Sequence, residues 1–228
     1  LDDCIIPAEN IVGTKEGEGI KQSNEVFGFT RLMVAAFGLG GGLSALEKAI
    51  AYSKERKQFG DYLYKKQGYT HKLIVPNAVR LTAAQAYIEY VADLLDSSDA
   101  DRQIEGSVAK FFATESGNKA AEDAIQAHGG YGYCKEYEVE KIKRDVRILT
   151  IYEGTSEIQQ NIIGVFRMRQ VVKGKGKFYN EMAKGLESMD DVLGPIVAKA
   201  ADFIDAAAYA AFKNKLSREQ HIIFEMAT

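Results

Sequence analysis

Apolar side chains recur at helical spacing along most of the chain. From Ile74 to Leu95 they follow one another at intervals of seven residues, which keeps one apolar stripe on a single helix. No proline occurs between Pro76 and Pro195, and this stretch is rich in Ala, Leu, Glu and Lys, which are strong helix formers. The pattern predicts helices over about 20–53, 70–97, 102–127, 138–148 and 156–170.

The segments between these helices are short. Loops at 56–68 and 128–137 interrupt them, and a basic, glycine-containing linker at 171–177 precedes helical stretches over about 178–190, 195–213 and 217–226. Long antiparallel helices with short connections predict an all-α fold, an up-and-down four-helix bundle with additional C-terminal helices. We expect three parts: 1–18 as the end of a preceding β-domain or a connecting arm, 19–170 as the bundle, and 171–228 as a helical extension.

Four glycines, at positions 38, 40, 41 and 42, fall inside the first predicted helix. Each costs a helix interior about 1 kcal/mol relative to Ala. Either the helix is kinked or split here, or another backbone or a ligand approaches closely, and we favour the close approach. A dinucleotide-binding glycine fingerprint is excluded, because Leu43 stands where its third glycine is required and the preceding strand is missing.

Composition narrows the function classes. The net charge of the 228 residues is 29 − 32 = −3, so no global basic field favours nucleic-acid binding. Cys4 and Cys134 are too few for a disulfide framework, which fits a reducing compartment. No run approaches the length of a membrane-spanning helix. The sequence starts at Leu1 without Met or a signal segment, and we expect a piece of a longer protein whose other part precedes it.

Two common catalytic arrangements are missing from the sequence. A carboxylate-bridged metal pair in a bundle needs Glu three residues before His, and none of His71, His128 and His221 has it, so no metal site is expected. No G-x-S-x-G motif supports a serine nucleophile. His71 and His221 are interpreted as surface or packing residues.

Two loop motifs are suited to nucleotide binding. ERKQFG, at 55–60, places Arg56 and Gln58 beside an aromatic ring, a combination suited to a phosphate and a flat ring. QAHGGYG, at 126–132, follows a glutamine with glycines whose bare backbone can approach a nucleotide.

A third motif places a carboxylate directly before a helix. RDVRILTIYEGTSEIQQ, at 144–160, positions Glu153 before Gly154 and Thr155, and Thr155 is predicted to cap the helix that follows. Read alone, a glutamate here is a capping residue or one favoured by the helix dipole. Alternatively, Glu153 is a base that lies beside a backbone N–H able to bind a substrate carbonyl.

Together these motifs resemble the C-terminal, four-helix-bundle domain of acyl-CoA dehydrogenases, the FAD-containing enzymes that form the α,β double bond of acyl-CoA thioesters. The resemblance covers about residues 2–167. It is carried by IPAENIVG, EGEG, FTR, YSKERKQFG, QAHGGYGY and RDVRILTIYEGTSEIQ.

The resemblance implies roles for individual residues. Glu153 matches the family's base, which removes the α-proton while the β-hydrogen leaves as hydride to FAD, and the Gly154 N–H is expected to bind the thioester carbonyl. Some branches carry the base before the arginine of FTR, where this chain has Thr30. Arg31 and Phe27 are expected near the CoA-binding mouth. FAD contacts are implied for Arg56, Phe59, Gln67, Gln126, Gly129, Gly130, Thr155 and Glu157.

The resemblance also implies partners and context. A homodimer or homotetramer is expected, because in the family several of these residues reach the FAD of a neighbouring subunit. Electron-transfer flavoprotein is the expected acceptor, acyl-CoA the substrate, fatty acid β-oxidation the process, and the bacterial cytoplasm or the mitochondrial matrix the location. The isolated chain is expected to be inactive, because the family's N-terminal helical and middle β-domains are missing from it. An acyl-CoA oxidase of the same fold and a non-catalytic helical scaffold are the alternatives.

Overall fold

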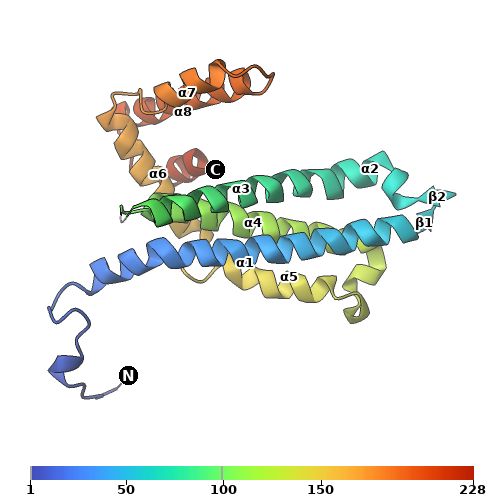
Figure 1. The fold of residues 1–228 in the computed structure, drawn as a ribbon, viewed down its shortest axis with the longest axis horizontal. Helices are drawn as coiled ribbons and strands as arrows, with labels where there is room; N and C mark the ends of the chain where they lie inside the picture. Colours follow the sequence, from blue (N-terminus) through green and yellow to red (C-terminus); the bar gives the residue numbers. More distant parts are fainter. Residues whose placement is uncertain (1, 99) are drawn as a thin grey trace. The chain divides into compact units, whose positions relative to one another are not determined.

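Helices make up almost all of the regular structure in the computed structural model, which describes residues 2–98 and 100–228 (Figure 1). The predicted all-α class is therefore confirmed. The chain divides into two compact units, unit 1 (Leu1–Glu153) and unit 2 (Gly154–Thr228), each with its own buried apolar clusters. Leu1, the first residue of the predicted N-terminal part, lies outside the described residues, as does Asp99.

Unit 1 is built around α1 (Gly19–Glu55), α3 (Val75–Ser97), α4 (Gln103–His128) and the shorter α5 (Val139–Arg147). α1 packs along α4, and α3 and α5 each contact both of these helices. Small buried side chains dominate the core and let the helices approach one another closely. Core members include Val34, Ala35, Ala45, Ala49, Leu81, Ala84, Val91, Ala113, Ala121, Ala124 and Val146.

Short elements connect the helices of unit 1. β1 (Lys57–Gln58) and β2 (Asp61–Tyr62) form an antiparallel ribbon across a turn in which Phe59 and Gly60 both have positive φ. α2 (Gln67–Tyr69) and the π-helix η3 (Thr70–Ile74) lead directly into α3, so the predicted helix over 70–97 begins as a π-helical turn. The 3₁₀ segments are η1 (Ala8–Asn10), η2 (Leu63–Lys65), η4 (Gly129–Tyr133), η5 (Lys135–Tyr137) and η6 (Ile148–Thr150).

The glycines of α1 do not break the helix, which runs through them without interruption. A Cβ on Gly38 would lie 2.8 Å from Cα of Thr114, and one on Gly117 of α4 would lie 2.1 Å from the carbonyl oxygen of Gly38. The predicted close approach of another backbone is thus confirmed, and no loop splits the helix. Gly41 faces α5 instead, because a Cβ there would meet Val146 at 2.4 Å.

α1 corrects one expectation. Among the described residues, this helix is long and apolar enough to cross a membrane by length and composition, although no such run was predicted from the sequence. A mostly buried core helix passes the same test, and although the apolar window of α1 is only 33% buried, the helix packs against α4 through Gly38 and Gly42. We therefore interpret α1 as the central helix of unit 1.

Unit 2 contains α6 (Ser156–Lys173), α7 (Asn180–Glu187), α8 (Gly194–Lys213) and α9 (Gln220–Ala227). α6 packs against α8 and α9, and α7 packs against α8. The linker predicted at 171–177 begins later than expected, because α6 continues to Lys173 before the chain turns.

The predicted parts and the observed units have different boundaries. The helix predicted over 156–170 is α6, which belongs to unit 2 because the two compact units divide between Glu153 and Gly154. The predicted bundle over 19–170 and extension over 171–228 stay predictions. Described residues 2–18 contain η1 and no strand, and all but Glu18 are exposed. The origin of 1–18 in a β-domain or a connecting arm stays a prediction.

Candidate active site

Glu153 ends unit 1, in the turn that follows η6. The Oγ1 hydroxyl of Thr30, on α1, donates a hydrogen bond of 2.8 Å to Oε2 of Glu153 in a partly buried setting. The long helix thus positions a donor for a carboxylate that lies far from it in sequence. Thr30 cannot itself act as a base, but it orients the group that can.

The backbone at Glu153 is in the left-handed region, with φ of 57°. This conformation costs a residue with a Cβ about 1–2 kcal/mol, and such strain is concentrated at functional sites. The next residue, Gly154, also has positive φ, at 92°, and is free of this cost. The turn therefore holds Glu153 in a conformation that its own local preferences oppose.

Arg31 follows Thr30 on α1 and is buried, with 4% of its surface exposed. Its Nη1 donates to the Oγ of Ser107 at 3.1 Å, and its Cζ lies 5.5 Å from the centre of the Phe27 ring. Burial lowers the pKa of Arg31, and the charge of nearby Glu153 acts in the opposite direction. Arg31 and Phe27 are therefore close together, as predicted, while their role at a CoA mouth stays a prediction.

The two loop motifs meet in one cavity of about 540 Å³ in unit 1. Arg56 directly follows α1, and Gly129 and Gly130 follow α4. The guanidinium of Arg56 lies 5.6 Å from the centre of the Tyr131 ring. The lining residues are Tyr52, Arg56, Gln58, Leu63, His128, Gly129, Gly130, Tyr131 and Cys134.

The glycines of this cavity leave its wall open. Gly129 has φ of 62° and ψ of −139°, a backbone conformation that is essentially restricted to glycine. A Cβ on either Gly129 or Gly130 would meet nothing within 4 Å. The space beside their backbone is therefore open to a ligand, and a guanidinium and an aromatic ring stand at the same cavity.

A ring stack that lines this cavity was not predicted from the sequence. The rings of Tyr52 and His128 stack with centroids 4.4 Å apart, and His128 Nδ1 lies 2.7 Å from the carbonyl oxygen of Ala124. Burial lowers the pKa of His128, which favours the neutral ring. Both residues lie inside the quoted motifs, but only the packing of α1 against α4 pairs them. Ser107, the partner of Arg31, has no signal in the sequence.

Other predicted binding residues are not brought into the cavity lining. Phe59 is 96% exposed at the tip of the ribbon, and Gln67 and Gln126 are also exposed. Thr155 and Glu157 belong to unit 2. Thr155 caps α6 as predicted, since its side chain accepts a hydrogen bond from the N–H of Ile158 at 3.4 Å.

Among the described residues, no cluster of three or more His, Cys, Asp or Glu side chains is arranged to hold a metal ion. The chemical groups of the site are therefore a positioned carboxylate, a buried guanidinium, and a cavity suited to phosphate and flat rings. Such a set can perform proton abstraction beside a bound nucleotide.

Comparisons with known proteins place these features in a family. A family model described as "Acyl-CoA dehydrogenase, C-terminal domain" matches residues 17–166. The chain is 41% identical over 166 residues to an acyl-CoA dehydrogenase of Bacillus subtilis, which covers 73% of this chain and 43% of that protein. It is 40% identical over 163 residues to a subunit of the caffeyl-CoA reductase–Etf complex of Acetobacterium woodii, which covers 72% of this chain and 42% of that protein.

A solved structure extends the likeness. The acyl-CoA dehydrogenase complexed with FAD from Bacillus anthracis superposes with a TM-score of 0.75 and 26% identity, over 92% of this chain and 41% of that one. This share exceeds what unit 1 supplies, so the likeness reaches into unit 2. The chain spans about two fifths of the length of the relatives that it matches.

Proposed function

Because this chain belongs to the acyl-CoA dehydrogenase family and contains its C-terminal domain, we propose that the whole protein is a flavin-dependent enzyme acting on acyl-CoA thioesters. The observation that carries the proposal is the hydrogen bond from Thr30 to Glu153, which orients the carboxylate of the family motif. The reaction is α,β-dehydrogenation, as in fatty acid β-oxidation.

Glu153 is the base in this proposal. Its carboxylate accepts the proton from the α-carbon, and the electron pair of that C–H bond forms the new double bond to the β-carbon. The N–H of Gly154, next in the chain, is proposed to donate to the thioester oxygen and stabilise the negative charge that develops there. Thr30 holds the carboxylate in the orientation that this transfer requires.

The residues of the unit 1 cavity fit FAD, which the Bacillus anthracis relative binds. Arg56 is suited to the diphosphate, the Tyr131 ring to a flat base, and the open backbone at Gly129 and Gly130 to close approach. FAD, when bound, supplies the acceptor for the hydride that leaves the β-carbon. The exposed Phe59, Gln67 and Gln126, with Thr155 and Glu157, are proposed as further contacts, some of them to a neighbouring subunit's FAD in a homodimer or homotetramer.

Electron-transfer flavoprotein is the proposed acceptor, because the Acetobacterium woodii relative is a subunit of a complex with Etf. The same relative is named a reductase, which favours a second candidate, the reverse reaction on an α,β-unsaturated acyl-CoA. Both directions use the same carboxylate, as a base in one and as an acid in the other. The location stays a prediction: the bacterial cytoplasm or the mitochondrial matrix.

Anaerobic flavin reduction tests the proposal. The whole protein, loaded with FAD, is mixed with acyl-CoAs of different lengths, and bleaching of the flavin's visible absorbance is followed. We expect bleaching by one subset of acyl-CoAs, and loss of that bleaching in Glu153→Gln with FAD still bound. Glu136→Gln, at an exposed carboxylate outside the site, is the matched control and should bleach at the parental rate.

The other outcomes select the alternatives. Bleaching by Glu153→Gln at the parental rate overturns the assignment of the base. Absence of bound FAD favours the helical scaffold, and peroxide formation in air favours an oxidase. If the reductase direction operates, an enoyl-CoA should reoxidise chemically reduced flavin and restore its visible absorbance.

A further inference from the structure

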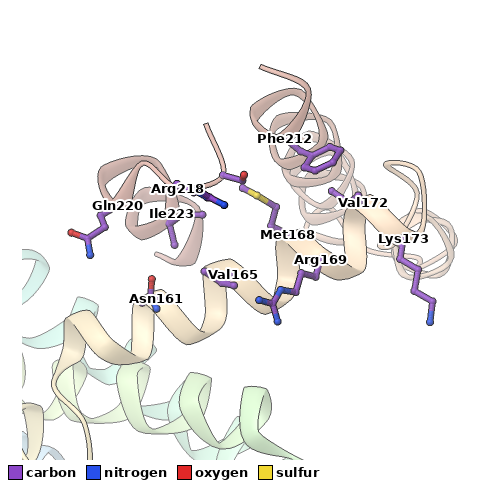
Figure 2. A pocket seen from close by; sticks show the side chains of 11 residues that line it. Asn161, Val165, Met168, Arg169, Val172, Lys173, Phe212, Arg218, Gln220 and Ile223 are labelled. Atoms are coloured by element: carbon purple, nitrogen blue, oxygen red, sulfur yellow. The ribbon is translucent and has the colours of Figure 1, made fainter. Parts of the chain in front are cut away.

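A second cavity, of about 640 Å³, lies entirely within unit 2 (Figure 2). One wall is a single face of α6, and the other is formed by the end of α8, the segment before α9, and α9 itself. Its size is typical of sites for small organic ligands. The lining residues are Asn161, Val165, Met168, Arg169, Val172, Lys173, Phe212, Ser217, Arg218, Gln220 and Ile223.

The floor of this unit 2 cavity is apolar. Met168 and Ile223 are buried and form one cluster with Ala211, against which Val165 and Val172 pack. Phe212 belongs to the cavity lining and is 45% exposed, which leaves an apolar ring surface available to a ligand.

The walls of the cavity are fixed by a close backbone approach. A Cβ on Gly164 of α6 would lie 2.6 Å from the carbonyl oxygen of Ile223, so only glycine lets α9 lie this close. The end of α9 is also tied to α6, because Gln160 Nε2 donates to the Oγ1 of Thr228 at 3.0 Å. The cavity is thus formed by the fold of unit 2 rather than by loosely placed side chains.

Its charged residues all have the same sign. Arg169, Lys173 and Arg218 line the cavity, and no Asp or Glu is among the lining residues. None of the three takes part in the ion pairs found among the described residues, and the guanidinium of Arg169 lies 5.2 Å from the centre of the Phe166 ring. The cavity thus combines cationic lining residues with an apolar floor.

We propose that the unit 2 cavity binds a single-chain amphiphile with an anionic head, of the fatty-acid carboxylate class. The apolar floor at Met168 and Ile223 would receive the chain, and the cationic lining residues Arg169, Lys173 and Arg218 would attract the head. The inference depends only on unit 2 and is independent of the proposed chemistry at Glu153.

Binding of sodium dodecanoate to the whole protein, followed by titration calorimetry below its micelle concentration, tests the proposal. We expect saturable binding that tightens about fourfold for each CH₂ added between decanoate and dodecanoate. Dodecyltrimethylammonium, with the same chain and the opposite charge, should bind much more weakly. Equal binding of the two amphiphiles contradicts the role given to the cations.

Two variants and a control assign the binding to this cavity. Arg218→Ala and Phe212→Ala should each weaken dodecanoate binding about fivefold, and circular dichroism checks that the helices are retained. Lys184→Ala removes an exposed cation of α7 outside the lining and should leave the affinity unchanged. Parental affinity in both cavity variants overturns the proposal.

Photolabelling locates the ligand directly. A diazirine analogue of dodecanoate should label peptides that contain 161–173 or 212–223, and unlabelled dodecanoate should suppress this labelling. Labelling only around Glu153 would place the amphiphile at the proposed active site and refute the inference. Binding to phosphatidylglycerol vesicles without binding of monomeric dodecanoate refutes it as well, in favour of a membrane-surface role.

Discussion

Thr30 and Glu153 are joined by a hydrogen bond of 2.8 Å although 123 positions separate them in the sequence. The hydroxyl on α1 donates to a carboxylate whose own backbone is held in the left-handed region. In this chain, Thr30 thus donates to the carboxylate that we propose as the base.

Thr30→Val removes the donor while keeping the shape of the side chain. Because the carboxylate loses the group that orients it, we expect the rate of flavin reduction to fall about tenfold with little change in KM. Thr30→Ser keeps the hydroxyl and should restore most of the rate. Stopped-flow absorbance measures both, and equal rates for the Val and Ser variants would contradict a positioning role.

Glu153→Gly and Glu153→Ala separate the backbone strain from the side chain. Both variants lose the carboxylate and its hydrogen bond, but only glycine adopts φ of 57° without steric strain. The free energy of unfolding of the Gly variant should exceed that of the Ala variant by about 1 kcal/mol, measured by urea denaturation. Equal stability of the two would show that the turn imposes no strain.

Gly117→Ala places a Cβ against the backbone of α1, which cannot yield as a side chain can. A Cβ there would lie 2.1 Å from the carbonyl oxygen of Gly38, and we expect a loss of about 1–3 kcal/mol in the free energy of unfolding. Gly40→Ala is the control, because its Cβ would meet nothing within 4 Å and should raise helix stability. Thermal and urea unfolding compare the two variants.

Arg56→Ala should weaken FAD retention about tenfold in the whole protein, since a charge-assisted contact to the diphosphate is lost. Lys57→Ala removes the neighbouring cation, which is not part of the cavity lining, and should retain FAD. The flavin-to-protein absorbance ratio after gel filtration is the measurement. Equal FAD loss in both variants would indicate a general effect of charge.

Tyr69 makes the stability depend on alkaline pH. Burial raises its pKa to about 12, and its hydroxyl donates to the carbonyl oxygen of Ala49 at 3.2 Å. Above pH 10 the unfolded chain loses this proton and the folded chain keeps it, so the free energy of unfolding falls as pH rises from 10 to 12. In Tyr69→Phe, the free energy of unfolding should fall by about 1–2 kcal/mol less between pH 10 and pH 12 than in the parent. Urea denaturation across that range measures the difference.

The sequence alone determined the helices, their approximate ends and the segments that carry chemistry. These features depend on local properties: the spacing of apolar residues, the scarcity of proline, the capping residue Thr155, and short motifs around Arg56 and Glu153. The close approach at the glycines of α1 could also be predicted from the sequence. Glycine is unfavourable in a helix, so several glycines together indicate that another group approaches the backbone closely.

Only the tertiary structure decided which of these segments meet. It brought Arg56 and Gly129 to one cavity, paired Thr30 with Glu153, and buried Arg31 beside Ser107. It also placed the helix after Glu153 in unit 2. Each of these results depends on contacts between residues far apart in the chain, and the periodicity of a helix specifies which face is buried without specifying the residue that covers it.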